Sequence, residues 1–264
     1  MRSLKYIRDL AKVLTVSLMC VTTAQAAAVL YYRDSLIGVD NMGAALSASA
    51  HSVTQATSQS EFRALVENGG WDLVIYFQQV YSSSTGADTA MANWVTGGGR
   101  AIFADWERNT DMGALFGASY TDTNGQTEMT FTNPALGTVS LNNPGWDTFS
   151  MGLSAFDSSE VMAHFANGQA AVVSGNSGRT ILNGFLNDTL PAEVGISVFS
   201  SQIEHVLAAQ VHSVPEPDSV ALCAFSLGLL LVCSRRRERC APCQPWKLLG
   251  SRASATPGQL THSA

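Results

Sequence analysis

The stretch WDLVIYF, Trp71–Phe77, is apolar at every position except Asp72 and is rich in β-branched and aromatic residues. A short run without polar alternation predicts a strand that is buried on both faces, as the central strands of parallel sheets are. The two glutamines that follow, Gln78 and Gln79, mark the carboxyl end of this strand. The chain is therefore expected to fold around one central strand, with other elements packed on both of its faces.

Segments of strand and helix character alternate on either side of this run. Further strands are predicted at Ala28–Tyr32, Ser52–Thr57, Arg100–Ala104, Glu160–Phe165, Ala170–Ser174 and Arg179–Phe185. Helices are predicted at Asn41–Ala50, at Ser60–Val66 with Ser60 as N-cap, at Thr89–Thr96 and at Ile196–Ala209, with a hairpin or irregular excursion at Thr127–Asn143. This alternation is typical of parallel β-α-β units. Residues 27–210 are therefore expected to form one three-layer, flavodoxin-like α/β domain with a mostly parallel sheet.

The order of these pieces resembles the class I glutamine amidotransferase-like fold. The matching pieces are Asp72–Tyr76, Trp94–Phe103 (WVTGGGRAIF), Asn143–Leu153 and Gly178–Phe185 (GRTILNGF). In that family a nucleophilic cysteine sits on a tight turn after the strand that corresponds to residues 101–104. Here the turn reads Ala104-Asp105-Trp106. The resemblance therefore implies the fold without the glutaminase chemistry.

Polar side chains follow several of the predicted strands. In open α/β sheets ligands bind beyond the carboxyl ends of the strands. This rule makes ligand-binding candidates of Asp34, Gln78, Gln79 and Asp105, with Asn187 and Asp188 as further members. Such oxygen atoms can hold calcium, although no metal site is indicated by spacing. The alternative interpretation is that these residues only end strands at a hydrated edge.

Two carboxylates and two aromatic residues are candidates for chemistry on a substrate. Asp105 and Glu107 are the catalytic candidates, because carboxylates at strand ends can serve acid–base chemistry, although nothing in the spacing identifies a pair. Trp106 and Trp146 are candidates for stacking against a sugar ring. No cofactor is expected from the sequence.

The body of the chain is strongly acidic. Residues 27–213 contain five arginines, no lysine and 17 acidic residues, which gives a formal charge of −12. This charge excludes nucleic acid as a partner, because binding to phosphates requires a basic surface. All five cysteines lie outside the body, so the body has neither a disulfide nor a thiol nucleophile.

The first 26 residues have the three parts of a secretory signal peptide. Basic residues precede the apolar run Val13–Val21, and Ala24-Gln25-Ala26 provides small residues for cleavage after Ala26. The general secretion machinery and signal peptidase are therefore expected partners. A lipoprotein signal ending at Cys20 is the alternative.

A second targeting signal follows the body, at residues 211–239. It consists of the motif Val214, Pro215, Glu216 and Pro217, a membrane segment at 219–234, and a cytoplasmic stop made of Arg235, Arg236, Arg237 and Arg239. The prolines keep the motif extended, and the positive-inside rule holds the arginines in the cytoplasm. The apolar core of the segment, Val220–Cys233, would reach about 21 Å as a helix.

This tripartite arrangement resembles the PEP-CTERM sorting signal of Gram-negative bacteria. The resemblance implies processing by an exosortase-type transpeptidase and association with exopolysaccharide and biofilm. An ordinary C-terminal anchor is the alternative. The remaining residues, 240–264, are polar, without pattern, and expected to be disordered.

Together these features predict an exported protein that passes through an inner-membrane intermediate to the cell surface or extracellular matrix, with a non-enzymatic body. The first alternative is an exported hydrolase or carbohydrate-active enzyme that uses Asp105 or Glu107. The second is an adhesion module that binds calcium or glycan.

Overall fold

The computed structural model describes residues 26–80 and 85–209, and every statement of structure below concerns these residues. The signal peptide up to residue 25, the sorting signal, its membrane segment at 219–234 and the tail at 240–264 lie outside the described residues. The chain divides into two compact units, Met1–Val211 and His212–Ala264, and all described residues belong to the first. Among them no helix has both the length and the apolar character needed to cross a membrane.

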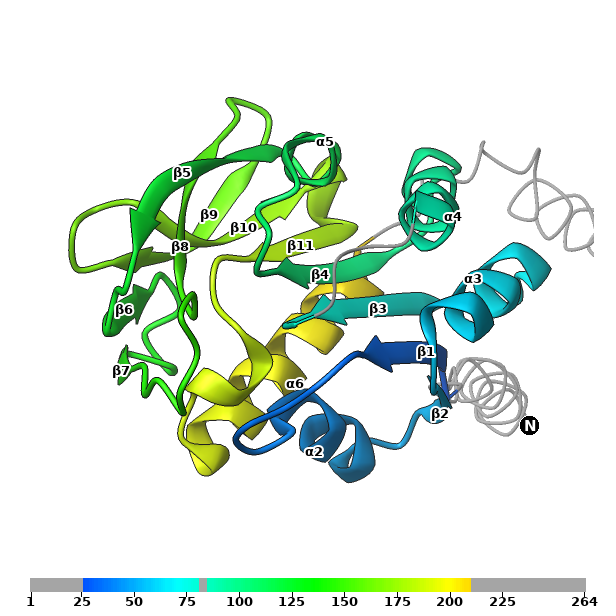
Figure 1. Cartoon of the computed structure of the whole chain (residues 1–264), viewed down its shortest axis with the longest axis horizontal. Coiled ribbons are helices and arrows are strands. Elements are labelled where there is room, and N and C mark those ends of the chain that lie inside the picture. The colour runs from blue at the N-terminus through cyan, green and yellow to red at the C-terminus, as the bar shows by residue number, and fades with distance from the viewer. Residues whose placement is uncertain (1–25, 81–84, 210–264) are drawn as a thin grey trace, which may run out of the picture. The chain divides into compact units, whose positions relative to one another are not determined.

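The described part is a mixed sheet with helices against it (Figure 1). The helices are α2 (Asn41–Ala48), α3 (Gln59–Asn68), α4 (Thr85–Thr96), α5 (Thr110–Leu115), α6 (Ala192–Ala208) and the short 3-10 helices η1 (Asn176–Gly178) and η2 (Asn187–Thr189). The strands are β1 (Ala28–Arg33), β2 (Ser52–Ala56), β3 (Leu73–Gln78), β4 (Ala101–Asp105), β5 (Ala118–Asn124), β6 (Glu128–Phe131), β7 (Thr138–Ser140), β8 (Met151–Ala155), β9 (Glu160–Phe165), β10 (Ala170–Gly175) and β11 (Thr180–Asn183).

The sheet has a parallel half and an antiparallel half. Its strand order is β2-β1-β3-β4-β11-β10-β9-β6-β7, while β8 pairs with β10 and β5 off this path. The first five strands of this order are parallel to one another, whereas every ladder from β11 onward is antiparallel. The expectation of a mostly parallel sheet was therefore wrong. The turns that join β9, β10 and β11 are too short for the crossover that a parallel pair needs, so these strands run back and forth.

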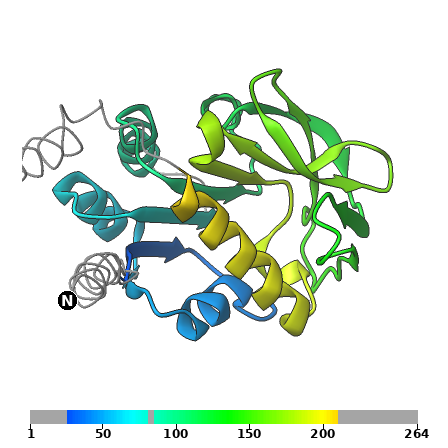
Figure 2. The same ribbon diagram turned by 180° about the vertical axis from the view of Figure 1, so that it is seen from behind.

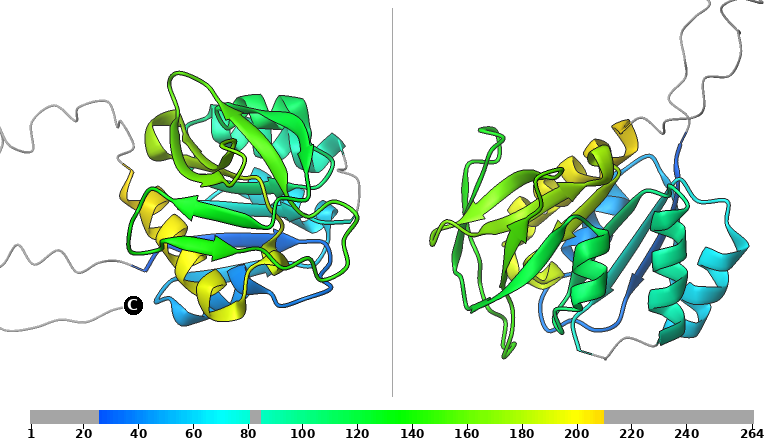
Figure 3. Two further views of the ribbon diagram at one scale, coloured as in Figure 1. Left: turned by 90° about the vertical axis from the view of Figure 1, so that its left-hand side faces the viewer. Right: turned by 90° about the horizontal axis from the view of Figure 1, so that it is seen from above.

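β3 is the central strand that its sequence predicts, because all six of its residues are buried. Leu73, Ile75 and Phe77 pack in a cluster with α2 and α6, while Val74 and Tyr76 pack in a second cluster with α3 and α4. Figure 2 shows α6 crossing the first face, and the right view of Figure 3 shows helices on both faces of the parallel strands. The parallel half therefore has three layers.

Several boundaries differ from the sequence-based expectations. Ser58, not Ser60, is the N-cap of α3 and accepts a hydrogen bond from the backbone of Glu61. The hairpin expected within 127–143 is present as β6 and β7. Local sequence pattern does not predict α5, β5 and β8, because their stretches are short or rich in threonine and serine.

Candidate functional site at the carboxyl edge of the sheet

Asp34 ties the end of β1 to the end of β3. Its Oδ1 atom accepts hydrogen bonds from the backbone N–H groups of Ser35 at 2.6 Å and Gln79 at 2.8 Å. Its Oδ2 atom accepts from the backbone N–H of Val80 at 2.9 Å. The carboxylate of Asp34, a ligand-binding candidate from its place in the sequence, thus accepts hydrogen bonds from three backbone N–H groups of the protein.

The two glutamines after the central strand are buried and are also bound internally. Gln79 is 2% exposed, and its Oε1 atom accepts from the backbone N–H of Asn187 at 2.9 Å while its Nε2 atom donates to the Ser35 carbonyl at 3.1 Å. Gln78 donates to the hydroxyl of Tyr76 at 2.7 Å. Gln79 therefore joins separate elements of the fold at this edge, whereas the hydrogen bond of Gln78 to Tyr76 lies within β3.

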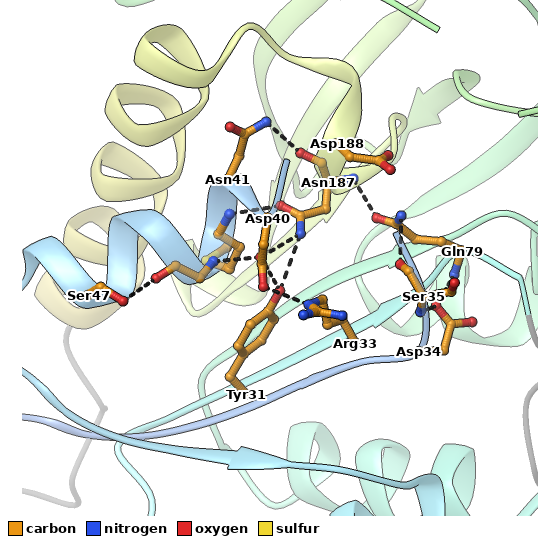
Figure 4. A network of polar contacts seen from close by, with 12 residues as sticks. Tyr31, Arg33, Asp34, Ser35, Asp40, Asn41, Ser47, Gln79, Asn187 and Asp188 are labelled. Carbon is orange, nitrogen blue, oxygen red and sulfur yellow. Dashed lines mark hydrogen bonds and ion pairs between the residues drawn. The ribbon is translucent and has the colours of Figure 1, made fainter. Parts of the chain in front are cut away.

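Asp40, which is absent from the sequence-based candidates, is the centre of the network in Figure 4. As N-cap of α2 it accepts from the backbone of Gly43 at 2.8 Å. It also accepts from the hydroxyl of Tyr31 at 2.7 Å, from Nε of Arg33 at 2.6 Å and from Nδ2 of Asn187 at 2.8 Å. An aspartate directly before a predicted helix is a cap signal, and this signal was available in the sequence.

The network fixes the ionisation of its members. Burial opposes the charged form of Asp40, but the hydrogen bonds from Asn187, Arg33, Gly43 and Tyr31 outweigh it and lower the pKa of Asp40. Burial, followed by the charge of Asp40, raises the pKa of Tyr31 well above its ordinary value. The pair therefore consists of a carboxylate and a neutral phenol at neutral pH.

η2 brings Asn187 and Asp188 to the same edge. Asn187 accepts from the backbone N–H of Met42 at 2.8 Å through Oδ1, and Asp188 accepts from the backbone of Ile37 at 2.9 Å and Gly38 at 3.0 Å. Asp188 also accepts from the indole N–H of Trp146 at 2.9 Å. Trp146, a candidate for sugar stacking, is half-buried against the core in this position.

Asp105 ends β4 and is fully buried. Its two oxygens accept from the backbone N–H groups of Glu107 at 2.9 Å and Asn109 at 2.8 Å, so the carboxylate shapes the turn before α5. Burial raises the pKa of Asp105 to about 6; the two amides lower it, and the charges of Glu107 and Asp88 raise it. The Glu107 side chain is exposed, so the two catalytic candidates occupy different environments.

Two polar groups beside this turn are buried without a hydrogen-bond partner among the described residues. They are the hydroxyl of Tyr120 and the indole N–H of Trp106. Burial, and then the charge of Asp105, raises the pKa of Tyr120 well above its ordinary value. The Trp106 side chain packs against the core, so it is not a free platform for a sugar.

The turn after β4 differs in conformation from a strained turn that presents a nucleophile. Among the described residues other than glycine, positive φ occurs at Arg108, Asn176 and Ser177, and not at Asp105 or Trp106. The described residues also contain no cysteine. Within residues 26–80 and 85–209, no group of three or more His, Cys, Asp or Glu side chains could hold a metal ion.

Two cavities lie away from the carboxyl edge. One, of about 430 Å³, runs between α6 and the antiparallel half, and its lining includes Asn133, Glu160, Met162 and His205. The Nε2 atom of His205 lies 3.0 Å from the hydroxyl of Ser174. The other, of about 450 Å³, lies where β1 begins and α6 ends.

The fold, but no family, is shared with known proteins. Neither a protein-family model nor a curated protein matches the chain. Among solved structures, the mmIFT52 N-terminal domain aligns over 70% of this chain and 100% of its own, with a TM-score of 0.50 and 10% identity. At this identity the likeness concerns the fold alone.

Glutamine amidotransferases are also among the similar structures. One from Thermotoga maritima aligns over 72% of this chain and 100% of its own, with a TM-score of 0.45 and 10% identity. Another, from Methylobacillus flagellatus, aligns over 70% of this chain and 94% of its own, with a TM-score of 0.41 and 10% identity. The mixed α/β sheet of the described part follows from its own strand pairing, and these structures are neighbours of it only.

Proposed function

We propose that this chain is an exported protein of the cell surface or extracellular matrix, sorted by its C-terminal signal, and that its folded domain is non-enzymatic. The position of Asp105 is the observation that supports a non-enzymatic domain. The resemblance to the amidotransferase-like family implies the nucleophile in the turn Ala104-Asp105-Trp106; here Asp105 is 0% exposed and both of its oxygens accept hydrogen bonds from backbone amides. A catalytic group must reach its substrate, and this carboxylate is turned into the protein.

The rest of the edge supports the same proposal. Asp34 and Asp188 each accept three hydrogen bonds from groups of the protein. Hydrogen-bonded polar networks rigidify a fold, and among the described residues of this network only Oδ1 of the buried Asn41 lacks a hydrogen-bond partner. In many α/β proteins this edge holds the active site. Here its polar side chains connect β1, β3, α2 and η2 through hydrogen bonds.

The proposed processing fits the extent of the folded domain. β1 begins at Ala28, two residues after the expected cleavage point, and α6 ends at Ala208, six residues before the sorting motif begins. Signal peptidase would act first, residues 219–234 would hold the intermediate in the membrane, and an exosortase-type transpeptidase would act near Pro215. Both cleavage sites would then lie outside the helices and strands, although Ala27 is hydrogen-bonded to the folded domain.

The proposed partner is a neutral exopolysaccharide, because the acidic body would repel an acidic polymer, and it is bound in the groove of about 430 Å³ beside α6. The exposed side chains of Asn133 and Glu160 and the half-buried Met162 offer hydrogen-bonding and apolar contacts there. Polymer from the producing bacterium should co-sediment with the wild-type protein and much less with Asn133→Ala/Met162→Ala. Equal retention of the two would exclude this groove.

The sorting half is tested in a Gram-negative host that has an exosortase. The wild-type chain should lose its C-terminal signal, as read by intact mass, and accumulate outside the inner membrane. Pro215→Ala/Pro217→Ala should stay full-length in the membrane fraction. A wild-type chain that remains full-length in the membrane of that host would overturn the proposal.

A second candidate function is acid–base catalysis by Asp105. It is favoured by a pKa of about 6 next to the unpartnered groups of Tyr120 and Trp106, since perturbed carboxyls often mark active sites. An activity on a glycan or ester panel that Asp105→Asn abolishes in a folded protein, and that the exposed-site control Asp157→Asn retains, would establish it. The adhesion-module alternative requires a rise in melting temperature with calcium or glycan.

A further inference from the structure

The cavity of about 450 Å³ lies at the amino ends of the parallel strands. Its lining includes Ala26, Ala27, His51, Asp72, Arg100 and Glu204, together with the last turn of α6. The expected cleavage point of the signal peptide, between the exposed Ala26 and the half-buried Ala27, thus lies at the edge of a cavity of the folded domain that charged side chains line.

The backbone around the cleavage point is held by polar side chains. The N–H of Ala27 donates to Nδ1 of His51 at 3.3 Å, and the N–H of Ala28 donates to Oδ2 of Asp72 at 2.8 Å. The Ala27 carbonyl accepts from the backbone of Ser52 at 2.8 Å. Ala27 is therefore already part of the fold in the uncleaved chain.

His51 connects this end of the chain to the last helix. Because its Nδ1 atom accepts from Ala27, the neutral ring carries its proton on Nε2. That atom lies 3.4 Å from Oε1 of Glu204 on α6, within ion-pair distance but without hydrogen-bond geometry. The cation that lines the cavity, Arg100, donates to the Ala209 carbonyl at 2.9 Å.

Hydrolysis after Ala26 changes the chemistry of this position. Water adds across the Ala26–Ala27 peptide bond, the carboxylate leaves with Ala26, and the nitrogen of Ala27 becomes an amine that takes up a proton. One N–H donor is thereby replaced by an ammonium with three. The new charge would appear beside His51 and the carboxylates of Asp72 and Glu204.

We propose that this cavity is a binding site for the processed N-terminus, in which His51 accepts a hydrogen bond from the Ala27 ammonium while Asp72 and Glu204 balance its charge. The inference rests on the proposed export of the chain and on cleavage after Ala26. Its consequence is that removal of the signal peptide joins β1 to the end of α6, the helix that precedes the sorting signal. The precursor already has the hydrogen bond from Ala27 to His51, and the mature domain would add the attraction between the Ala27 ammonium and the carboxylates of Asp72 and Glu204.

The composition of the chain makes this site measurable. Residues 27–246 contain no lysine, so after cleavage the α-amine of Ala27 is their only primary amine. Amine acetylation followed by peptide mapping therefore reports on this group and separates it from Lys247 wherever the tail is retained. A synthetic peptide of residues 27–33 in the same tube supplies the rate of an unprotected amine.

Full-length protein is produced in the exporting host, and intact mass is read before labelling. The wild-type amine should react several-fold more slowly than the peptide, because the carboxylates of Asp72 and Glu204 would stabilise the ammonium and only the free amine reacts. Glu204→Gln, at a largely exposed side chain, should recover part of the rate, and Glu204→Gln/Asp72→Asn most of it. Glu193→Gln, which removes an equal charge from the other end of α6, should leave the protection unchanged.

The outcomes separate the inference from the export proposal. A chain that begins at Ala27 but reacts as fast as the peptide, or whose protection survives Glu204→Gln/Asp72→Asn, overturns the binding site and leaves export intact. A mature chain that begins at another residue overturns the site and the expected cleavage together. His51→Ala provides a further check, and a fast rate in that variant supports the site only where its circular dichroism spectrum matches that of the wild type.

Discussion

The side-chain amide of Asn187 donates a 2.8 Å hydrogen bond to Asp40, which lies 147 residues earlier in the chain. The same side chain accepts from the backbone of Met42, so it closes the first turn of α2 from outside the helix. Asn187 is 0% exposed, and Asp40 is the N-cap of that helix. The connection after β11 is thereby locked to the connection after β1.

Asn187→Ala should lower the free energy of unfolding by about 2 to 4 kcal/mol. The substitution leaves the buried Met42 N–H without its acceptor, which costs about 1 to 3 kcal/mol, and removes one of the four hydrogen bonds to the Asp40 carboxylate. Urea unfolding measures the change. Asn93→Ala, at an exposed position of α4, is the matched control and should be neutral or slightly stabilising, because alanine is the better helix former. Equal losses in the two variants would contradict the role of the network.

Asp40 should contribute to acid unfolding. Its pKa is lower in the folded protein than its ordinary value of 3.8, so its stabilising effect is complete above that value and disappears as the pH falls through the folded pKa. The difference in unfolding free energy between wild type and Asp40→Asn should therefore be largest near neutral pH and shrink below about pH 4. Urea titrations at a series of pH values measure it. If the difference in unfolding free energy grew as the pH fell, the lowered pKa of Asp40 would be contradicted.

Asp105 should have the opposite pH dependence in a separate range. Its folded pKa of about 6 lies above the ordinary value of 3.8, so folding is favoured when the group is protonated and this advantage is lost as the pH rises through 6. Relative to Asp105→Asn, the wild type should lose on the order of 3 kcal/mol between pH 4 and pH 7. Parallel stability curves for the two proteins would show that Asp105 titrates normally.

The parallel half of the sheet could be predicted from the sequence, and most of the antiparallel half could not. Trp71–Phe77 and Arg100–Ala104 are short apolar runs, which only a strand covered on both faces explains. β5, by contrast, reads ASYTDTN and is mostly exposed or half-buried, so its pattern resembles a loop. Its pairing with β8 depends on contacts between residues more than 25 positions apart. Local pattern does not contain that information.

The candidate site shows the same division. The rule for strand ends placed Asp34, Gln79 and Asp188 at one edge, and the structure brings them together. It did not reveal that their hydrogen bonds are taken up by the protein itself, because the donors come from Val80 and from the indole of Trp146. The partners of a polar side chain depend on tertiary structure. Residue type and spacing therefore indicated where the polar cluster lies but not what it does.

Gly175 tests how closely the unpredicted segment packs on β10. A Cβ atom at this position would lie 2.2 Å from the carbonyl oxygen of Phe116 and 2.9 Å from its carbonyl carbon. The φ of Gly175 is −112°, so the glycine is required by this contact and not by backbone conformation. Gly175→Ala must move β10 away from the residue that ends α5, and overpacking of this kind costs about 1 to 3 kcal/mol or more.

Gly125→Ala is the informative comparison for that variant. Gly125 has a φ of +76° and nothing within 4 Å of an added Cβ, so alanine there meets backbone strain without a clash. That strain costs about 1 to 2 kcal/mol and should leave the packing of the antiparallel half unchanged. Hydrogen exchange distinguishes the two effects: Gly175→Ala should speed exchange of the amides of β10 and β5, whereas Gly125→Ala should affect only its own turn. Unchanged protection of β10 in Gly175→Ala would mean that α5 and β5 pack less closely than their carbonyl contact implies.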